Sequence, residues 1–289
     1  LENHCFFEYS DYFNFGSGNL LIDTLFFRPY VWLKRILPDV FFRNQHDYFF
    51  RWYYKIYVKL VEHICRSRII YADHEKGGGV YYLRPSGRSD VQLENFEKKE
   101  YGKLFLYGWL FRNPIGIEKY RKGIVEYFRP KKQVVNKVDS FVKSLRDRYS
   151  TIVGVHMRRG DYEKDFHNGE LFFREEEVSV ILEEYLVFSR KERGSVCFVV
   201  CSDGQVDLDE FAQLSVVKTD FSAVEDLYTL SQTDVIIGSD STFGAFSSYY
   251  GNVPFIVFKK GGIDWSYYVD KKNYFENKYS LLFDQDLKV

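Results

Sequence analysis

Three short polar segments follow apolar runs and carry residue types that bind anions. They are HMRRGDY at 156–162, CSD at 201–203 and GSDSTFG at 238–244. Paired arginines form bidentate, charge-assisted hydrogen bonds with phosphate oxygens. A Ser-Thr pair that opens a helix adds hydroxyl groups and unpaired backbone N–H groups, which also favour anions. Together the three segments predict a phosphate site.

Between residues 150 and 260 the sequence alternates between apolar runs and amphipathic stretches. The apolar runs predict strands at 151–159, 195–203, 215–219, 234–240 and 253–259. The stretches between them predict helices at 175–192, 206–214, 223–233 and 241–251. This alternation indicates an α/β fold with a parallel sheet covered by helices on both faces. Ligands of such sheets bind at the carboxyl ends of the strands, so we expect the three polar segments to meet at one edge.

The first half of the chain is predicted to be a separate, more helical domain. Residues 20–70 have apolar positions at intervals of three and four, interrupted by Pro29 and Pro38, which indicates helices. Further strands are expected at 69–73, 79–87 and 103–111, and amphipathic helices at 117–130 and 133–150. The expected domains are therefore 1–149 and 150–289.

Composition limits the classes of partner. The 289 residues are 45% hydrophobic and 28% charged, which is typical of a globular protein. A net charge of −1 gives no general attraction to nucleic acid or to an anionic membrane, so an anion site has to be local. No run of about 18 apolar residues is present, so no membrane-spanning helix is expected. The expected location is cytoplasmic, or lumenal or membrane-associated if a targeting segment precedes this sequence.

The cysteines give little indication of a metal site. Cys197 and Cys201 lie four apart in a predicted strand, so their side chains share one face of the sheet. No second pair and no nearby histidine completes a zinc motif, and buried free thiols are expected instead.

Each polar segment also has a simpler interpretation. RGD at 159–161 spells an integrin-binding tripeptide, but it directly follows a strand, whereas adhesion requires an exposed flexible loop. Paired arginines are often surface charge, and Ser241 before a helix is often only an N-cap. Asp161 could orient an arginine or accept a proton. The convergence of all three segments on one sheet edge favours a ligand site.

The polar segments carry a resemblance to a known family. VGVHMRRGDY at 153–162 resembles the HxRRxDY motif of the inverting α-1,2-fucosyltransferases, and more loosely that of α-1,6- and protein O-fucosyltransferases. VEDLYTLSQTDVIIGSDSTFGAFSSYYG at 224–251 resembles the second signature of that family, and FVVCSDG at 198–204 resembles its strand ending in Ser-Asp. The resemblance covers residues 100–260.

The resemblance implies a GT-B fold, in which two Rossmann-like domains face a cleft. It implies GDP-fucose as the donor, held mainly by the C-terminal domain, a glycan as the acceptor and no metal cofactor. Arg158 would be catalytic, with Asp161 as a general base or as a brace for an arginine. The implied donor-binding residues are His156, Arg158, Arg159, Ser202, Asp203, Asp226, Ser241, Thr242 and Phe243. Ser202, Asp203 and Asp226 would lie near the guanosine.

In the first half, only FGSGNLLID at 15–23 is similar to the Gly-x-Gly-Asn-Gln motif of the family, with Leu20 in place of Gln. Asn19 of this segment would point to the fucose. Elsewhere, Asp240 stands where the family usually has Asn. These departures concern the acceptor and the linkage more than the donor nucleotide.

Three alternatives remain open from sequence. The first is a related enzyme with another linkage or donor, such as an α-1,6- or protein O-fucosyltransferase or a transferase of another nucleotide-linked deoxysugar. The second is a catalytically inactive module that binds a glycan or a nucleotide sugar, which the 19% aromatic content would suit. The third is an adhesion protein that uses RGD.

Overall fold

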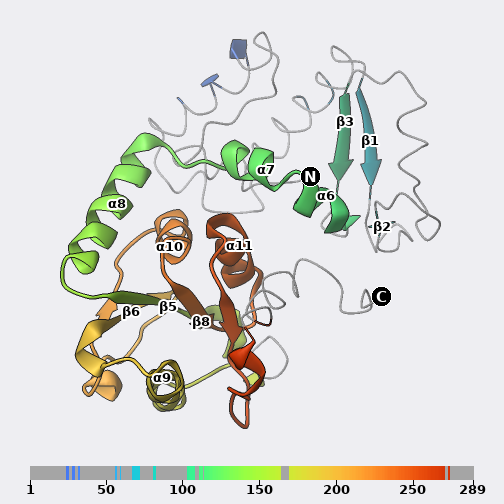
Figure 1. Ribbon diagram of the computed structural model, residues 1–289. Helices are drawn as coiled ribbons and strands as arrows, with labels where there is room; N and C mark the ends of the chain where they lie inside the picture. Colours follow the sequence, from blue (N-terminus) through green and yellow to red (C-terminus); the bar gives the residue numbers. More distant parts are fainter. Residues whose placement is uncertain are drawn as a thin grey trace. The chain divides into compact units, whose positions relative to one another are not determined.

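The computed structural model describes residues 114–163 and 169–270 continuously (Figure 1). Elsewhere it describes only short pieces, at 24–25, 28–29, 32, 56, 59, 67–71, 81–82, 103–107, 111–112 and 273. The chain divides into two compact units, Leu1–Lys131 and Lys132–Val289. The division therefore precedes the helix that the sequence analysis placed at the end of the first domain, 1–149.

The second unit is built on one five-stranded sheet. Its strands are β5 (Thr151–Met157), β6 (Val196–Ser202), β7 (Val216–Lys218), β8 (Val235–Gly238) and β9 (Phe255–Val257). They lie in the order β7-β6-β5-β8-β9, and all neighbouring pairs are parallel. The predicted parallel α/β fold of the C-terminal half is confirmed.

Helices cover both faces of this sheet. Helices α8 (Lys132–Arg146), α10 (Ala223–Leu230) and α11 (Thr242–Gly251) cover one face, and α9 (Glu175–Ser189) covers the other (Figure 1). Side chains alternate between the faces along each strand. In β5, Val153 and Val155 belong to the cluster that contains the α9 side chains, whereas Ile152 packs with α8, α10 and α11.

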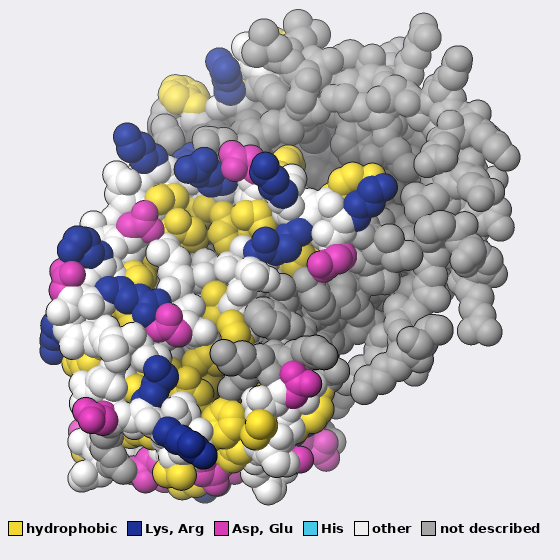
Figure 2. Space-filling view, viewed as in Figure 1, with side chains coloured by type: hydrophobic (Ala, Val, Ile, Leu, Met, Phe, Trp, Pro, Cys, Tyr) yellow, Lys and Arg dark blue, Asp and Glu magenta, His cyan; other side chains and the backbone are white. Residues whose placement is uncertain are grey.

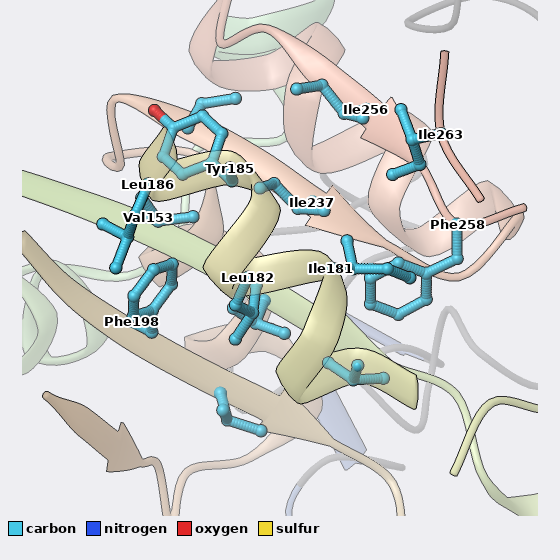
Figure 3. Packing of buried hydrophobic residues seen from close by; sticks show 14 of the residues in the cluster. Val153, Ile181, Leu182, Tyr185, Leu186, Phe198, Ile237, Ile256, Phe258 and Ile263 are labelled. Atoms are coloured by element: carbon cyan, nitrogen blue, oxygen red, sulfur yellow. The ribbon is translucent and has the colours of Figure 1, made fainter. Parts of the chain in front are cut away.

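The α9 side of the sheet forms the larger core. Ile181, Leu182 and Tyr185 of α9 are buried in one cluster with Val153 and Phe198 of the sheet (Figure 3). Because both faces are buried, the strands are continuous apolar runs rather than alternating ones, which is why the sequence predicted them. The carboxyl ends of the strands thus extend from a sheet that is packed on both faces.

The packing on the other face of the sheet explains where the boundary between the two units falls. Val138, Val142 and Leu145 of α8 are buried in one cluster with sheet residues, so α8 belongs to the second unit rather than to the first. Cys197 and Cys201 are buried in the same cluster and are free thiols, as the strand spacing predicted.

Two predicted helices differ from the structure. The helix predicted at 206–214 is wrong, because only a single 3₁₀ turn, η8 (Asp209–Phe211), forms there. Asp207 Oδ1 accepts a hydrogen bond from the Asp209 backbone N–H at 3.0 Å, a local turn that competes with helix formation. The helix predicted at 117–130 is instead two short helices, α6 (Pro114–Lys119) and α7 (Arg121–Tyr127).

In the first unit the structure describes two pairs of parallel strands. Strand β1 (Ser67–Tyr71) pairs with β3 (Lys103–Tyr107), and β2 (Tyr81–Tyr82) pairs with β4 (Phe111–Arg112). The helices predicted within 20–70 are described only at isolated positions, and Asn19 lies outside the described residues.

The described surface carries charges of both signs. On the face in Figure 2, Lys and Arg side chains are interspersed with Asp and Glu side chains. Anion binding therefore has to be argued from individual residues rather than from a broad basic area. Among the described residues, no helix combines the length and the apolar character needed to cross a lipid bilayer.

Candidate active site

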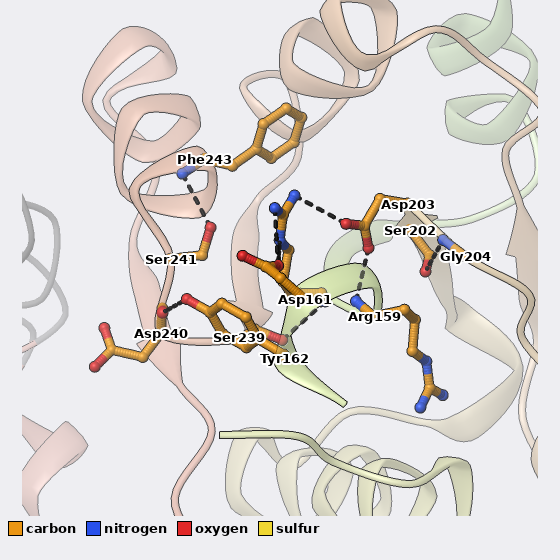
Figure 4. Close-up of polar contacts among 11 residues, drawn as sticks. Arg159, Asp161, Tyr162, Ser202, Asp203, Gly204, Ser239, Asp240, Ser241 and Phe243 are labelled. Atoms are coloured by element: carbon orange, nitrogen blue, oxygen red, sulfur yellow. Dashed lines mark hydrogen bonds and ion pairs between the residues drawn. The ribbon is translucent and has the colours of Figure 1, made fainter. Parts of the chain in front are cut away.

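The strand order creates a switch point between β5 and β8. From β5 the chain first adds β6 and β7 on one side, and then returns to add β8 and β9 on the other. In open parallel sheets, ligands bind at such a point, beyond the carboxyl ends of the strands. The three polar segments of the sequence follow β5, β6 and β8, so they meet at this edge as predicted (Figure 4).

Two hydrogen bonds join the loops that follow β5 and β8. The Arg158 backbone N–H donates to Ser239 Oγ at 3.0 Å, and the Tyr162 hydroxyl donates to the Asp240 carbonyl at 2.6 Å. Burial is the largest cause that raises the pKa of Tyr162, so the phenol keeps its proton for this bond. The loop with the arginines is therefore fixed against the loop that leads into α11.

The Arg158 guanidinium lies between two carboxylates. Its Nε and Nη2 are each 3.0 Å from Asp161 Oδ1, and its Nη1 is 2.8 Å from Asp203 Oδ2. About one third of the Arg158 side chain is exposed. These contacts account for three of the five N–H groups of a guanidinium, so two remain for an anionic ligand.

The neighbouring Arg159 has different surroundings. Its Nη1 donates to the Phe173 carbonyl at 2.9 Å, its Nη2 is 2.6 Å from Glu175 Oε1, and its guanidinium lies over the Phe172 ring. β5 ends at Met157, and the backbone at Arg159 is no longer extended (φ −110°, ψ −86°). The Arg159 side chain is buried and points away from Asp161 and Ser241 (Figure 4). Of the two adjacent arginines, only Arg158 thus places its guanidinium at the carboxyl edge of the sheet.

The N-terminus of α11 supplies the third part of the edge. Ser241 is the N-cap residue, and its Oγ accepts a hydrogen bond from the Phe243 backbone N–H at 3.1 Å (Figure 4). Thr242 is exposed in the first turn. The partial positive charge of a helix N-terminus favours an anion here, while the capping bond shows that Ser241 also has a structural role.

His156 lies beneath this helix rather than on the surface. Its ring is stacked on Phe243 with 5.0 Å between centroids, and Nδ1 has no hydrogen-bond partner among the described residues. Burial, and to a smaller extent the charge of Arg158, lowers the pKa of His156 to about 4, against the opposing effect of Asp203. His156 is therefore neutral near pH 7.

Asp226 lies beside the ends of β6 and β7. Its Oδ1 accepts a hydrogen bond from Thr219, the residue that follows β7. Burial raises the pKa of Asp226 to about 6 although this hydrogen bond lowers it. Ser202, at the end of β6, accepts a hydrogen bond through Oγ from the Gly204 backbone N–H. Of the three predicted guanosine residues, Asp226 lies beside β6 and β7, whereas Asp203 contacts the predicted phosphate residue Arg158.

Sequence reasoning missed several residues that shape this site. Ser239 and Tyr162 stood inside the quoted motifs, so their positions were available although their hydrogen bonds were not. Glu175 opens α9 and pairs with Arg159, and no sequence spacing pointed to this contact. Among the described residues, no group of three or more His, Cys, Asp or Glu side chains is arranged to hold a metal ion.

Comparison with known families identifies the chain. The sequence profile of glycosyl transferase family 11 matches residues 86–257, which include the segments after β5, β6 and β8 and make up more than half of the chain. The chain belongs to glycosyl transferase family 11. The resemblance to α-1,2-fucosyltransferases predicted from the motifs is confirmed at the level of the family.

Several solved fucosyltransferase structures share a more distant similarity. POFUT1 in complex with GDP-fucose has 16% identity and a TM-score of 0.42, with 57% of each chain covered. NodZ α-1,6-fucosyltransferase soaked with GDP-fucose has 17% identity and a TM-score of 0.40, again with 57% of each chain covered. Arabidopsis thaliana FUT1, solved as a variant with GDP, has 12% identity and a TM-score of 0.38, with 71% of this chain and 54% of that chain covered.

The family 11 chain thus spans less than two thirds of the length of these solved proteins. Comparison with curated protein sequences gives no significant match.

Proposed function

We propose that this family 11 protein transfers fucose from GDP-fucose to a hydroxyl group of a glycan, with an α-1,2 linkage and inversion at the sugar. The observation that carries the proposal is Arg158 at the switch point, hydrogen-bonded through its backbone to the loop that leads into α11. This arrangement lies within the part of the chain that matches the family.

The nucleotide would lie along the edge of the sheet. The guanosine would lie near Ser202 and Asp226, beside β6 and β7, and the diphosphate would lie near Ser241, Thr242 and Phe243 at the start of α11. Helix N-termini bind phosphate through backbone N–H groups and the helix dipole, which supports this direction of binding.

Arg158 would stabilise the leaving group. When the bond between fucose and the β-phosphate breaks, negative charge develops on the phosphate oxygens, and fixed donors aimed at that charge lower the barrier. Arg158 retains two N–H groups for these oxygens and is already oriented by two carboxylates. Because Arg158 supplies a positive charge at this position, the proposed reaction needs no divalent cation there.

Asp161 would act mainly on Arg158. Its Oδ1 faces both Nε and Nη2 of the guanidinium, which is the geometry of a brace. Its Oδ2 remains for the hydroxyl of an acceptor, so the same carboxylate could accept a proton as the new bond forms.

Thermal unfolding of the full chain with GDP, GDP-fucose, UDP and dTDP, each with and without EDTA, tests the donor. A ligand at 100 times its dissociation constant stabilises a protein by about 2.7 kcal/mol. We expect GDP and GDP-fucose to raise the melting temperature, UDP and dTDP to leave it unchanged, and EDTA to have no effect. Stabilisation by UDP or dTDP alone would exclude the proposed donor.

Transfer assays then separate the remaining alternatives. GDP release from GDP-fucose with a panel of glycan acceptors, followed by linkage analysis of the product, should reveal an α-1,2 bond. A product with an α-1,6 bond or a fucosylated protein would support the related enzymes instead. GDP binding without turnover on any acceptor, and without hydrolysis, would support a binding module.

A further inference from the structure

Asp203 contacts two consecutive residues of the neighbouring loop. Its Oδ1 accepts a hydrogen bond from the Arg159 backbone N–H at 2.6 Å, and its Oδ2 lies 2.8 Å from Nη1 of Arg158 (Figure 4). Asp161 holds the same guanidinium through Nε and Nη2. Carboxylates that follow β5 and β6 therefore fix Arg158 from two sides, while the backbone bond fixes the chain that carries it.

Two glycines leave the space for this contact. A Cβ atom on Gly160 would lie 2.9 Å from Asp203 Oδ2, and a Cβ atom on Gly204 would lie 2.7 Å from the Cβ of Arg159. Both distances are shorter than ordinary contacts between such atoms. One glycine from each loop is thus needed for the two loops to lie this close together.

Stability is a poor explanation for the ion pair between Arg158 and Asp203. Their side chains are 36% and 34% exposed, and ion pairs in contact with solvent contribute little to folding. The two carboxylates instead hold the Arg158 guanidinium in one orientation. Two of its N–H groups are left for a ligand. Electrostatic stabilisation of a leaving group requires that the charged group be oriented before the reaction.

We propose that Asp203 is a positioning residue that orients Arg158 toward the diphosphate of the donor, rather than a contact to the guanosine. This inference rests on the proposed function. Asp203 carries negative charge close to where the diphosphate would bind, so it opposes donor binding while it aligns the group that acts on the leaving phosphate. Removal of that charge should affect binding and turnover in opposite directions.

Asp203→Asn separates these effects in GDP-fucose hydrolysis, which needs no acceptor. The amide oxygen can still accept from the Arg159 backbone, but the amide nitrogen cannot pair with the guanidinium. By analogy with loss of an orienting partner, we expect kcat to fall about 10- to 100-fold, with KM for GDP-fucose unchanged or lower. Asp209→Asn, the same change at an exposed position, is the matched control and should leave both constants unchanged.

A double-mutant cycle tests whether Asp203 acts through Arg158. In an Arg158→Ala background, Asp203→Asn should cause no further loss of kcat, because the group that it orients is absent. Added guanidinium chloride should partly restore turnover in Arg158→Ala but not in Arg158→Ala/Asp203→Asn. An unchanged kcat with a raised KM in Asp203→Asn, or equal losses with and without Arg158, would overturn the inference.

A spectroscopic measurement keeps this test apart from the proposed function. Hydrogen exchange of the Arg158 Nη1–H groups, which Asp203 contacts, followed by ¹⁵N NMR of the full chain, should be slow in the wild type and in Asp209→Asn and faster in Asp203→Asn. Equal exchange in all three proteins would overturn the positioning role even in an active enzyme. Absence of both GDP stabilisation and GDP-fucose turnover in the wild type would refute the proposed function and would leave the exchange result unaffected.

Discussion

Asp226 Oδ1 accepts a hydrogen bond from Thr219 Oγ1 at 2.6 Å, and both side chains are buried. Burial raises the pKa of Asp226 to about 6, since the hydrogen bond only partly offsets the loss of water. At neutral pH, an ionised carboxylate that is buried away from water reduces the stability of the folded protein. Perturbed carboxylates of this kind concentrate at ligand sites, and Asp226 lies beside the sheet edge where the guanosine is proposed to bind.

Asp226→Asn should stabilise the protein at neutral pH. The folded pKa exceeds the usual value of 3.8, so the folded state binds the proton more tightly and stability falls as pH rises from about 4 to about 6. The variant does not lose stability over this pH range. Its amide oxygen can still accept the hydrogen bond from Thr219. We expect a gain of up to about 3 kcal/mol at pH 7 that disappears below pH 4, measured by urea unfolding. Weaker stabilisation of the variant by GDP would support the donor contact.

His156→Phe should make the protein more resistant to acid. The pKa of His156 is lowered to about 4, so as pH falls from 6.5 to 4 the unfolded state takes up a proton that the folded state does not. This group should remove about 3 kcal/mol of stability over that interval in the wild type and nothing in the variant. Phenylalanine keeps the stacking on Phe243. Parallel acid-unfolding curves for the two proteins would contradict the buried, neutral state of the ring.

Alanine substitution should distinguish the roles of the two adjacent arginines, Arg158 and Arg159. Arg159→Ala leaves Glu175 without its partner in a largely buried position and should reduce stability by about 3 kcal/mol, measured by chemical unfolding. Arg158→Ala should leave stability nearly unchanged and reduce GDP-fucose turnover about 100- to 1,000-fold. A large stability loss in Arg158→Ala, or unchanged stability in Arg159→Ala, would reverse this assignment.

Two substitutions of Ser241 distinguish capping from phosphate binding. Ser241→Ala removes the hydrogen bond to the Phe243 N–H and should cost about 1 kcal/mol of stability. Ser241→Asp keeps an N-cap acceptor but adds a negative charge where the diphosphate is proposed to bind. Its stability without ligand should match the wild type, whereas the melting shift with GDP should be lost. A full GDP shift in Ser241→Asp would leave Ser241 with only its capping role.

The sheet was predictable because its strands are buried on both faces. Continuous apolar runs such as VCFVVCS at 196–202 cannot serve as surface helices, and the helices between them required parallel connections. The error at 206–214 arose because the side chain of Asp207 stabilises a turn, which outweighs the apolar spacing around Phe211. Tertiary packing also decided that α8 belongs to the second unit, and local sequence carries no signal for that choice.

The site was predictable in its position but less so in its contacts. Parallel topology alone brings the ends of β5, β6 and β8 together, whatever their side chains do. Asp203 was expected beside a guanosine, but it contacts Arg158 and the backbone of Arg159, because Gly160 and Gly204 allow the two loops to approach. Such a contact depends on the separation of two strands and their loops, which sequence spacing does not encode.

The different partners of Arg158 and Arg159 have a consequence for deletions within β5. A one-residue deletion within β5 would preserve the dipeptide Arg-Arg but move each arginine back by one place, so that the first would take the buried place of Met157 and the second the place of Arg158. Glu175 would then lose the arginine that pairs with it, and a guanidinium would be forced into the core beside the strand. Distant homologues should therefore be recognised by the number of residues between the first buried position of the strand and the arginines, and not by the arginine pair alone.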